Sequence, residues 1–117
     1  MERDRESIGL TAECQTLLSD IEARGWFQEG ADIARFCLAF AVRAGVSDGS
    51  TTGTETRWAA GNFDKTGEIR ALLAGLYPEC ETPVRLMEYL VNVGLRMVGE
   101  RLRDSGVGPA DLMEWQS

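Results

Sequence analysis

Side chains that could do covalent chemistry are few in this chain of 117 residues. It has no histidine, so it lacks the commonest general base and the usual ligand of catalytic zinc. Its three cysteines form no CxxC pair, which argues against a zinc site and a disulfide framework. Cys14 and Cys37 recur with apolar residues at helical spacing and are expected in the core, while Cys80 lies between two glutamates that oppose formation of the thiolate. No cysteine is therefore predicted to act as a nucleophile.

Carboxylates and glycines form no known site pattern either. The 13 glycines never form GxxxxGK[ST] or GxGxxG, the patterns of phosphate-binding loops. Several carboxylates share no ligand spacing and are expected to solubilise the surface: Glu22, Glu29, Asp32, Asp64, Glu68 and Glu88. We therefore predict no metal, no cofactor and no catalysis.

The strongest surface signal is a set of basic and polar residues near the C-terminal end. Arg85, Asn92, Arg96 and Arg103 share one narrow arc of a predicted helix, because separations of 7 and 11 residues return to nearly the same side. Two interpretations stay open: a solvated helix face, or a face that contacts the phosphates of DNA.

The first part of the chain predicts a strand followed by two helices. Ile8 to Leu10 has the pattern of a short strand, and Thr11 is placed to cap a helix that Gly25 ends. A second helix is expected over residues 31–44, where charged residues occupy a narrow arc and apolar side chains fill the remainder.

The apolar composition of this second helix predicts that the protein forms an oligomer. A helix so apolar is expected to be central and to need more cover than one small chain offers. We expect a homodimer or a higher even oligomer with Phe36 and Phe40 at or beneath the interface. Gly94, near the middle of the apolar face of the later helix, would allow a close crossing and is a third interface candidate.

Residues 47–56, reading SDGSTTGTET, have the small polar composition of a flexible linker. They are predicted to divide a single domain, residues 1–117, into a strand-helix-helix half at 1–46 and a helical half at 57–117.

The second half predicts three helices. Thr66 could cap the first, which Pro78 stops. Pro83 begins the longest helix, which is expected to run to about Asp104. A short final turn of helix is predicted over residues 110–115.

The charge of the chain restricts its ligands. A formal net charge of −7 argues against a protein that coats nucleic acid indiscriminately, so any DNA contact must be local. No positively charged leader precedes an apolar run at the start, and the longest apolar stretch is shorter than the roughly 20 residues of a membrane span. We predict a cytoplasmic protein that makes no membrane contact.

The first half resembles the ribbon-helix-helix family. Leu10-Thr11-Ala12-Glu13 matches that family's strand exit, and Arg35-Phe36-Cys37-Leu38 matches its core helix. The resemblance implies that strand residues enter the major groove, which here would be Arg5, Ser7 and Gly9. It also implies a phosphate grip at the start of the second helix, where this chain has Gln28, Glu29 and Gly30.

A longer stretch, from Ile8 to about Val98, is similar to the DndE family of bacterial DNA sulfur-modification (phosphorothioation) proteins. The matching residues are Arg35-Phe36, Thr56-Arg57-Trp58, Gly61, Ile69-Arg70-Ala71-Leu72-Leu73, Cys80, Arg85-Leu86 and Gly94-Leu95. The resemblance implies a compact, largely helical oligomer that binds DNA through lysine-rich surfaces. This chain has one lysine, Lys65, whereas a role as a partner subunit does not depend on such a surface.

The predicted fold is mainly α, with a short N-terminal strand followed by a helical C-terminal half. Our first functional hypothesis is a non-catalytic, oligomeric, DNA-associated accessory protein of a bacterial DNA modification, restriction or transcription-control system, working with protein partners of that system. The second is a protein-interaction adaptor that does not contact DNA, which the net charge of −7 favours. A metal-dependent hydrolase built on carboxylates ranks third.

Overall fold

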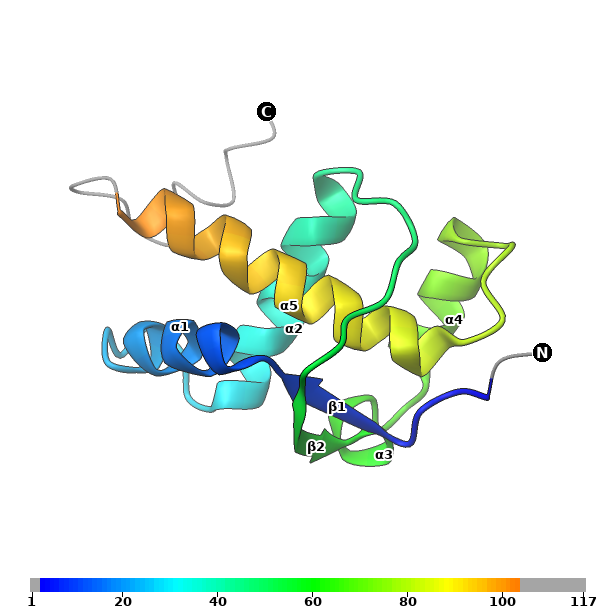
Figure 1. The fold of residues 1–117 in the computed structure, drawn as a ribbon, viewed down its shortest axis with the longest axis horizontal. Coiled ribbons are helices and arrows are strands. Elements are labelled where there is room, and N and C mark those ends of the chain that lie inside the picture. Colours follow the sequence, from blue (N-terminus) through cyan, green and yellow to red (C-terminus); the bar gives the residue numbers. More distant parts are fainter. Residues whose placement is uncertain (1–2, 104–117) are drawn as a thin grey trace.

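The computed structural model describes residues 3–103 and is mainly α-helical, with one small antiparallel sheet (Figure 1). In chain order the elements are β1 Ser7–Leu10, α1 Ala12–Glu22, α2 Gly30–Arg43, β2 Glu55–Ala59, α3 Ala60–Phe63, α4 Glu68–Leu76 and α5 Pro83–Leu102. The predicted fold class, mainly α with a short N-terminal strand, is confirmed. The predicted helix end at Asp104 and the final turn at 110–115 lie outside the described residues.

Local signals set most helix ends. The Thr11 side chain accepts a hydrogen bond from the Cys14 amide at 3.2 Å, and so caps α1 as predicted. Gly25 follows α1 with a φ of 73°, a left-handed conformation that costs glycine little. Pro83 is the first residue of α5, also as predicted.

The start of α4 differs from the prediction. Thr66 accepts only the Glu68 amide, at 3.4 Å. The buried carboxylate of Asp64 instead accepts the next two amides, those of Ile69 at 3.0 Å and Arg70 at 3.1 Å. A carboxylate forms stronger hydrogen bonds to helix amides than a hydroxyl does, so Asp64 is the main cap.

The core forms where α5 lies across α2 (Figure 1). A Cβ atom on Gly94 would overlap the carbonyl oxygen of Cys37, so only glycine permits this close crossing. The crossing buries most of the apolar face of α2: Ile33, Ala34, Cys37, Leu38, Phe40 and Ala41. The expectation that one chain cannot cover this helix is therefore wrong, and the close approach at Gly94 is made within the chain.

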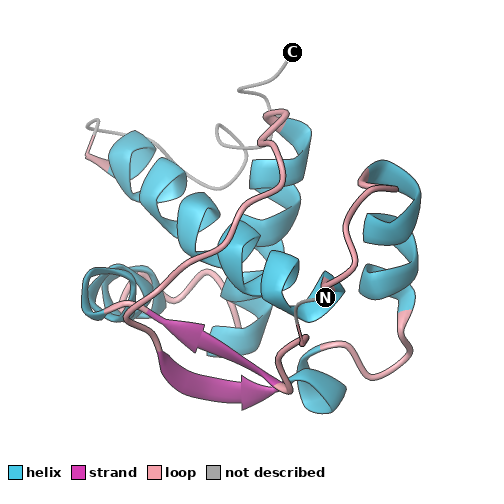
Figure 2. Ribbon diagram, turned by 45° about the vertical axis from the view of Figure 1, so that its right-hand side comes forward, coloured by secondary structure: helices cyan, strands magenta, loops and turns pink. Residues whose placement is uncertain are grey.

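The segment predicted as a linker contributes to the sheet. β1 pairs with β2, whose first residues, Glu55 and Thr56, belong to the predicted linker (Figure 2). Thr51 is buried, and the Thr54 hydroxyl lies 3.1 Å from Oε1 of Glu88. The pairing joins the two predicted halves, because β1 lies in the first half and β2 starts in the predicted linker and continues into the second half.

The residues before β1 are tied to the start of α5. Asp4 accepts the Val84 amide at 3.0 Å and the Arg85 amide at 2.9 Å. These are first-turn amides, which have no partner inside the helix. The cap of α5 thus comes from a residue far away in the sequence. Within residues 3–103, no helix combines the length and apolarity needed to cross a membrane.

Candidate functional site

The predicted arc of basic and polar residues on α5 is partly covered by other elements of the fold. Asn92 is fully buried, and its amide nitrogen donates to the carbonyl oxygens of Gly9 at 3.0 Å and Glu88 at 2.8 Å. Its amide oxygen accepts the Thr11 amide at 3.1 Å. The prediction of an exposed position is wrong for Asn92, because β1 and the start of α1 cover this part of α5.

Next to Asn92, a buried glutamate engages the strand residues that were predicted to enter a DNA groove. Glu88 is 1% exposed and forms an ion pair with Arg5, with Nε and Oε2 3.0 Å apart. Its other oxygen accepts the Gly9 amide at 2.9 Å. Burial of a carboxylate costs free energy unless such partners compensate its lost hydration. Arg5 and Gly9 therefore serve the fold in this structure.

Ser7, the other predicted groove residue, contacts the neighbouring strand. Its hydroxyl oxygen lies 3.1 Å from the hydroxyl oxygen of Thr56. β1 thus pairs along one edge with a strand of its own chain, and Arg5, Ser7 and Gly9, which the ribbon-helix-helix interpretation requires to be free for DNA, all make contacts within the chain.

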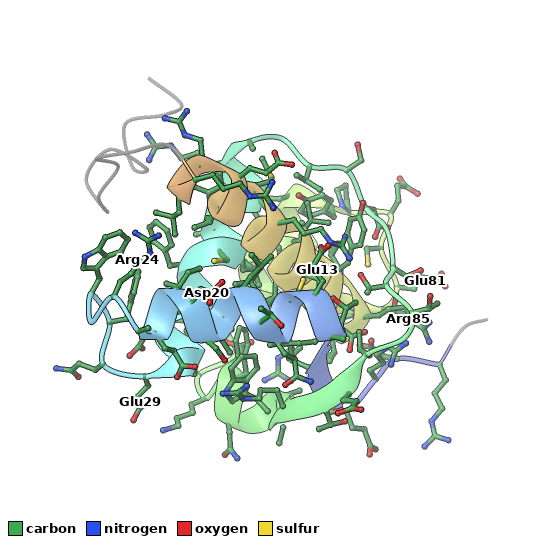
Figure 3. The ribbon with its side chains drawn as sticks, turned by 60° about the vertical axis from the view of Figure 1, so that its left-hand side comes forward. Glu13, Asp20, Arg24, Glu29, Glu81 and Arg85 are labelled. Atoms are coloured by element: carbon green, nitrogen blue, oxygen red, sulfur yellow. The ribbon has the colours of Figure 1, made fainter. Side chains whose placement is uncertain are left out.

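The three arginines of the predicted arc lie in different environments along α5. Arg85 is half-buried and donates to the carbonyl oxygen of Arg3 at 3.0 Å. Arg96 is exposed and pairs with Glu13 at 2.9 Å, and Arg103 is exposed where α5 ends. In Figure 3, which looks onto α1, Arg85 and Arg24 lie toward opposite ends of that helix, with Glu13 between them. Arg85, Arg96 and Arg103 therefore lie apart from one another along α5 and its C-terminal end.

Three other cations do converge. A pocket of about 280 Å³ opens between the start of α2, strand β2 and the turn that follows α3. We call it the basic pocket; its lining includes Arg35, Arg57, Lys65, Trp58 and Asn62. Lys65 is the single lysine of the chain, and Glu29 is the one acidic residue in the lining.

Arg35 is the fixed member of the basic pocket. Its Nε donates to the carbonyl oxygen of Phe63 at 2.9 Å, and its Nη1 donates to Asp32 at 3.1 Å. Its guanidinium also lies 5.3 Å from the centre of the Phe63 ring. These contacts come from two elements, so α2 and α3 hold the guanidinium at the mouth of the pocket.

Arg57 and Lys65 are the adjustable members. Both are exposed, and the ion pair of Arg57 with Glu22 is long, at 3.9 Å. Its guanidinium lies 5.5 Å from the centre of the Trp58 ring, which in turn packs against Phe63 at 5.7 Å. An exposed ion pair at such a distance contributes little, so Arg57 can exchange Glu22 for another anion at small cost.

This arrangement suits a phosphate next to an aromatic or sugar ring. Guanidinium groups bind phosphate oxygens through paired N–H donors, and a lysine adds a compact positive charge. A neighbouring indole supplies an apolar surface on which a base or sugar can rest. Sequence reasoning missed this pocket, although the Arg57-Trp58 pair in a strand is a signal that could have indicated it.

The cysteines predicted in the core are found there. Cys14 and Cys37 are fully buried, and desolvation by burial raises the pKa of both thiols. Within residues 3–103, no three acidic or cysteine side chains gather as potential metal ligands.

The basic pocket is the candidate functional site, since it is where cations from three parts of the fold meet in an acidic protein. Comparison with protein-family models, with curated proteins and with solved structures gives no match to this chain.

Proposed function

We propose that the protein is a non-catalytic accessory protein that binds the backbone of DNA through the basic pocket. The observation that carries this proposal is the convergence of Arg35, Arg57 and Lys65 beside Trp58. The resemblance to the DndE family supports DNA as the ligand. It also supports a place in a bacterial DNA modification, restriction or transcription-control system.

The negative net charge of the molecule restricts its contact with DNA to one small surface. Apart from the basic pocket, an acidic surface repels the duplex, since the net charge is −7. Each phosphate neutralised by the protein lowers the slope of log K against log salt by about 0.9. Three cations therefore predict a slope no steeper than about −3. A protein that wraps DNA has a much steeper slope.

The test is a salt titration of binding to a short, fluorescently labelled duplex. The variant Arg57→Ala/Lys65→Ala removes the two adjustable cations of the basic pocket. Its matched control is Arg96→Ala/Arg103→Ala, which makes the same charge change on an exposed arginine of α5 and on the exposed arginine at its C-terminal cap. We expect the pocket variant to bind at least about 10-fold more weakly, with a slope reduced by about 2, and the control to bind like the wild type.

Equal losses in both variants would assign DNA binding to overall charge or to the α5 arginines, and would contradict the pocket. Absence of binding by the wild type at low salt would contradict the DNA proposal itself. The second candidate, an adaptor that does not contact DNA, would then stand. It is favoured by the internal contacts of Arg5, Arg85 and Asn92, which occupy side chains that a DNA interface would need.

A further inference from the structure

A second cavity lies outside the basic pocket and differs from it in character. It is a groove of about 500 Å³ between the C-terminal end of α2 and the C-terminal end of α4. Its lining is largely apolar and includes Val42, Val46, Leu76, Tyr77, Pro78 and Cys80. In Figure 1 these two helix ends lie on the same side of the molecule, with α4 standing apart from the core.

The apolar surface continues from the groove along α4. Leu72 is 53% exposed and Leu76 is 51% exposed, and a spacing of four residues places both on one helix face. α4 buries only Leu73, so most of its apolar side chains do not serve this core. Two large exposed leucines beside an apolar groove are typical of an interaction site.

The groove is preformed. The Tyr77 hydroxyl donates to the Val46 carbonyl oxygen at 2.6 Å and so ties the end of α4 to the end of α2. A partner would enter an existing cavity and would not have to order its walls, which lowers the cost of binding.

Charge selects the kind of partner. Asp48 and Glu79 line the groove, Glu81 follows close by in the sequence, and no lysine or arginine is among the lining residues. A second copy of this chain would bring the same carboxylates and a net charge of −7 to the contact. A basic partner would instead pair with the carboxylates while its apolar side chains fill the groove.

We propose that this groove and the exposed face of α4 bind an amphipathic helix of another protein, one that carries leucine-like residues on one face and lysine or arginine at its edges. An amphipathic helix carries apolar anchors three to four residues apart on one face, and the groove together with the exposed Leu72 and Leu76 offers the apolar surface on which such anchors pack. The groove shares no residue with the basic pocket, so this inference and the DNA proposal can fail independently.

The probe is a synthetic amphipathic helix of leucine and lysine, about 14 residues or four turns long, with a second peptide that has glutamate at every lysine position. Calorimetry measures affinity, and the alkylation rate of Cys80 by N-ethylmaleimide reports occupancy of the groove. Cys80 is the one half-buried thiol, whereas Cys14 and Cys37 are fully buried.

Three variants make the test specific. Leu76→Ser removes an exposed apolar anchor, and Glu79→Lys reverses a charge in the groove. Asp20→Lys makes the same charge change at an exposed position on α1 and is the control. We expect at least about 10-fold weaker binding of the lysine peptide by the first two variants, unchanged binding by the control, and slower alkylation of wild-type Cys80 in the presence of peptide.

Equal weakening by Asp20→Lys, equal binding of the glutamate peptide, or unchanged alkylation of Cys80 would each overturn the inference. Circular dichroism of every variant excludes loss of fold as the cause. If sedimentation shows a wild-type dimer that Leu76→Ser dissociates, the groove binds a second copy, and the basic partner is wrong.

Discussion

At the scale of single residues, polar side chains buried between elements decide how the N-terminal part of the chain attaches to α5. Glu88 and Asn92 are one helical turn apart and together engage the backbone of Gly9 and Thr11. Arg5 completes the arrangement through its ion pair with Glu88. Buried polar groups of this kind are costly when one partner is lost.

Removal of the Asn92 amide should therefore destabilise the protein. Asn92→Ala leaves the Gly9 carbonyl and the Thr11 amide without this partner, at about 1–3 kcal/mol for each buried group. Urea unfolding should show a lower midpoint than the wild type. Asn62→Ala, at an exposed position, is the control and should change stability by less than about 0.5 kcal/mol. Equal effects of the two changes would contradict the buried role of Asn92.

The hydrogen-bonded carboxylate of Asp64 predicts that the stability of the fold depends on pH. Burial alone would raise the pKa of its carboxyl group, but the amides of Ile69 and Arg70 and the Arg70 guanidinium together lower it. Because the pKa is lower in the folded state, the carboxylate stabilises the protein above its unfolded pKa of about 3.9. That stabilisation is lost as the pH falls through the folded pKa.

Asp64→Asn should accordingly be less stable than the wild type at neutral pH, by about 1.5–3 kcal/mol for charged hydrogen bonds. The difference should shrink as the pH falls below about 4. Thermal melts from pH 7 to pH 2.5 measure it. Asp20→Asn, at an exposed position on α1, serves as the control. A difference that stays constant with pH would show that Asp64 is not held as a carboxylate.

At the scale of elements, the crossing of α2 and α5 organises the fold. Gly94 permits it, because any Cβ there would meet the backbone of Cys37. Gly75 also lies inside a helix, α4, but a Cβ there would meet nothing within 4 Å. Substitution at Gly75 therefore measures the effect of helix propensity on stability, and substitution at Gly94 measures the effect of packing.

Gly75→Ala should stabilise the protein by up to about 1 kcal/mol, the difference in helix propensity between the two residues. Gly94→Ala should destabilise it by several kcal/mol or prevent folding, because backbone cannot move aside as a flexible side chain can. Denaturant unfolding of both variants gives the comparison. A neutral Gly94→Ala would show that the helices can separate without loss.

At the scale of the whole molecule, the surface divides into distinct regions. The basic pocket and the apolar groove are built from different residues, and the rest of the chain is predominantly acidic. The two ligands proposed above, DNA and a basic amphipathic helix, would therefore bind without one blocking the other. Self-association remains a prediction; among its candidate residues Phe36 is half-buried, whereas Phe40 and Gly94 are buried within the chain.

Phe36 and Phe40 test whether copies pair through α2. Phe40 is 6% exposed, so Phe40→Asp should unfold the chain. Phe36 is half-buried against Phe27, with ring centroids 5.4 Å apart, so Phe36→Glu should keep the fold. If the protein forms a dimer through this face, sedimentation velocity should show a folded monomer for Phe36→Glu. A dimer that persists would place the interface elsewhere.

The sequence by itself determined the local features of this protein. The spacing of apolar residues predicted α1, α2, α4 and α5, while Thr11, Gly25 and Pro83 marked helix ends because caps act within one turn. The cysteines of the core followed from the same periodicity. Charge restricted any DNA contact to a local site, and this restriction still shapes the proposed function.

Only the tertiary structure decided where side chains distant in the sequence meet. β2 begins inside the polar segment that was predicted as a linker, and it forms a strand because it pairs with β1, which is far away in the sequence. Asn92 shared a helix arc with arginines, and only the packing of β1 shows that this arc is covered. The basic pocket joins residues of α2, β2 and the turn after α3, whose proximity no local pattern encodes. Such sites depend on long-range packing, which periodicity and caps do not specify.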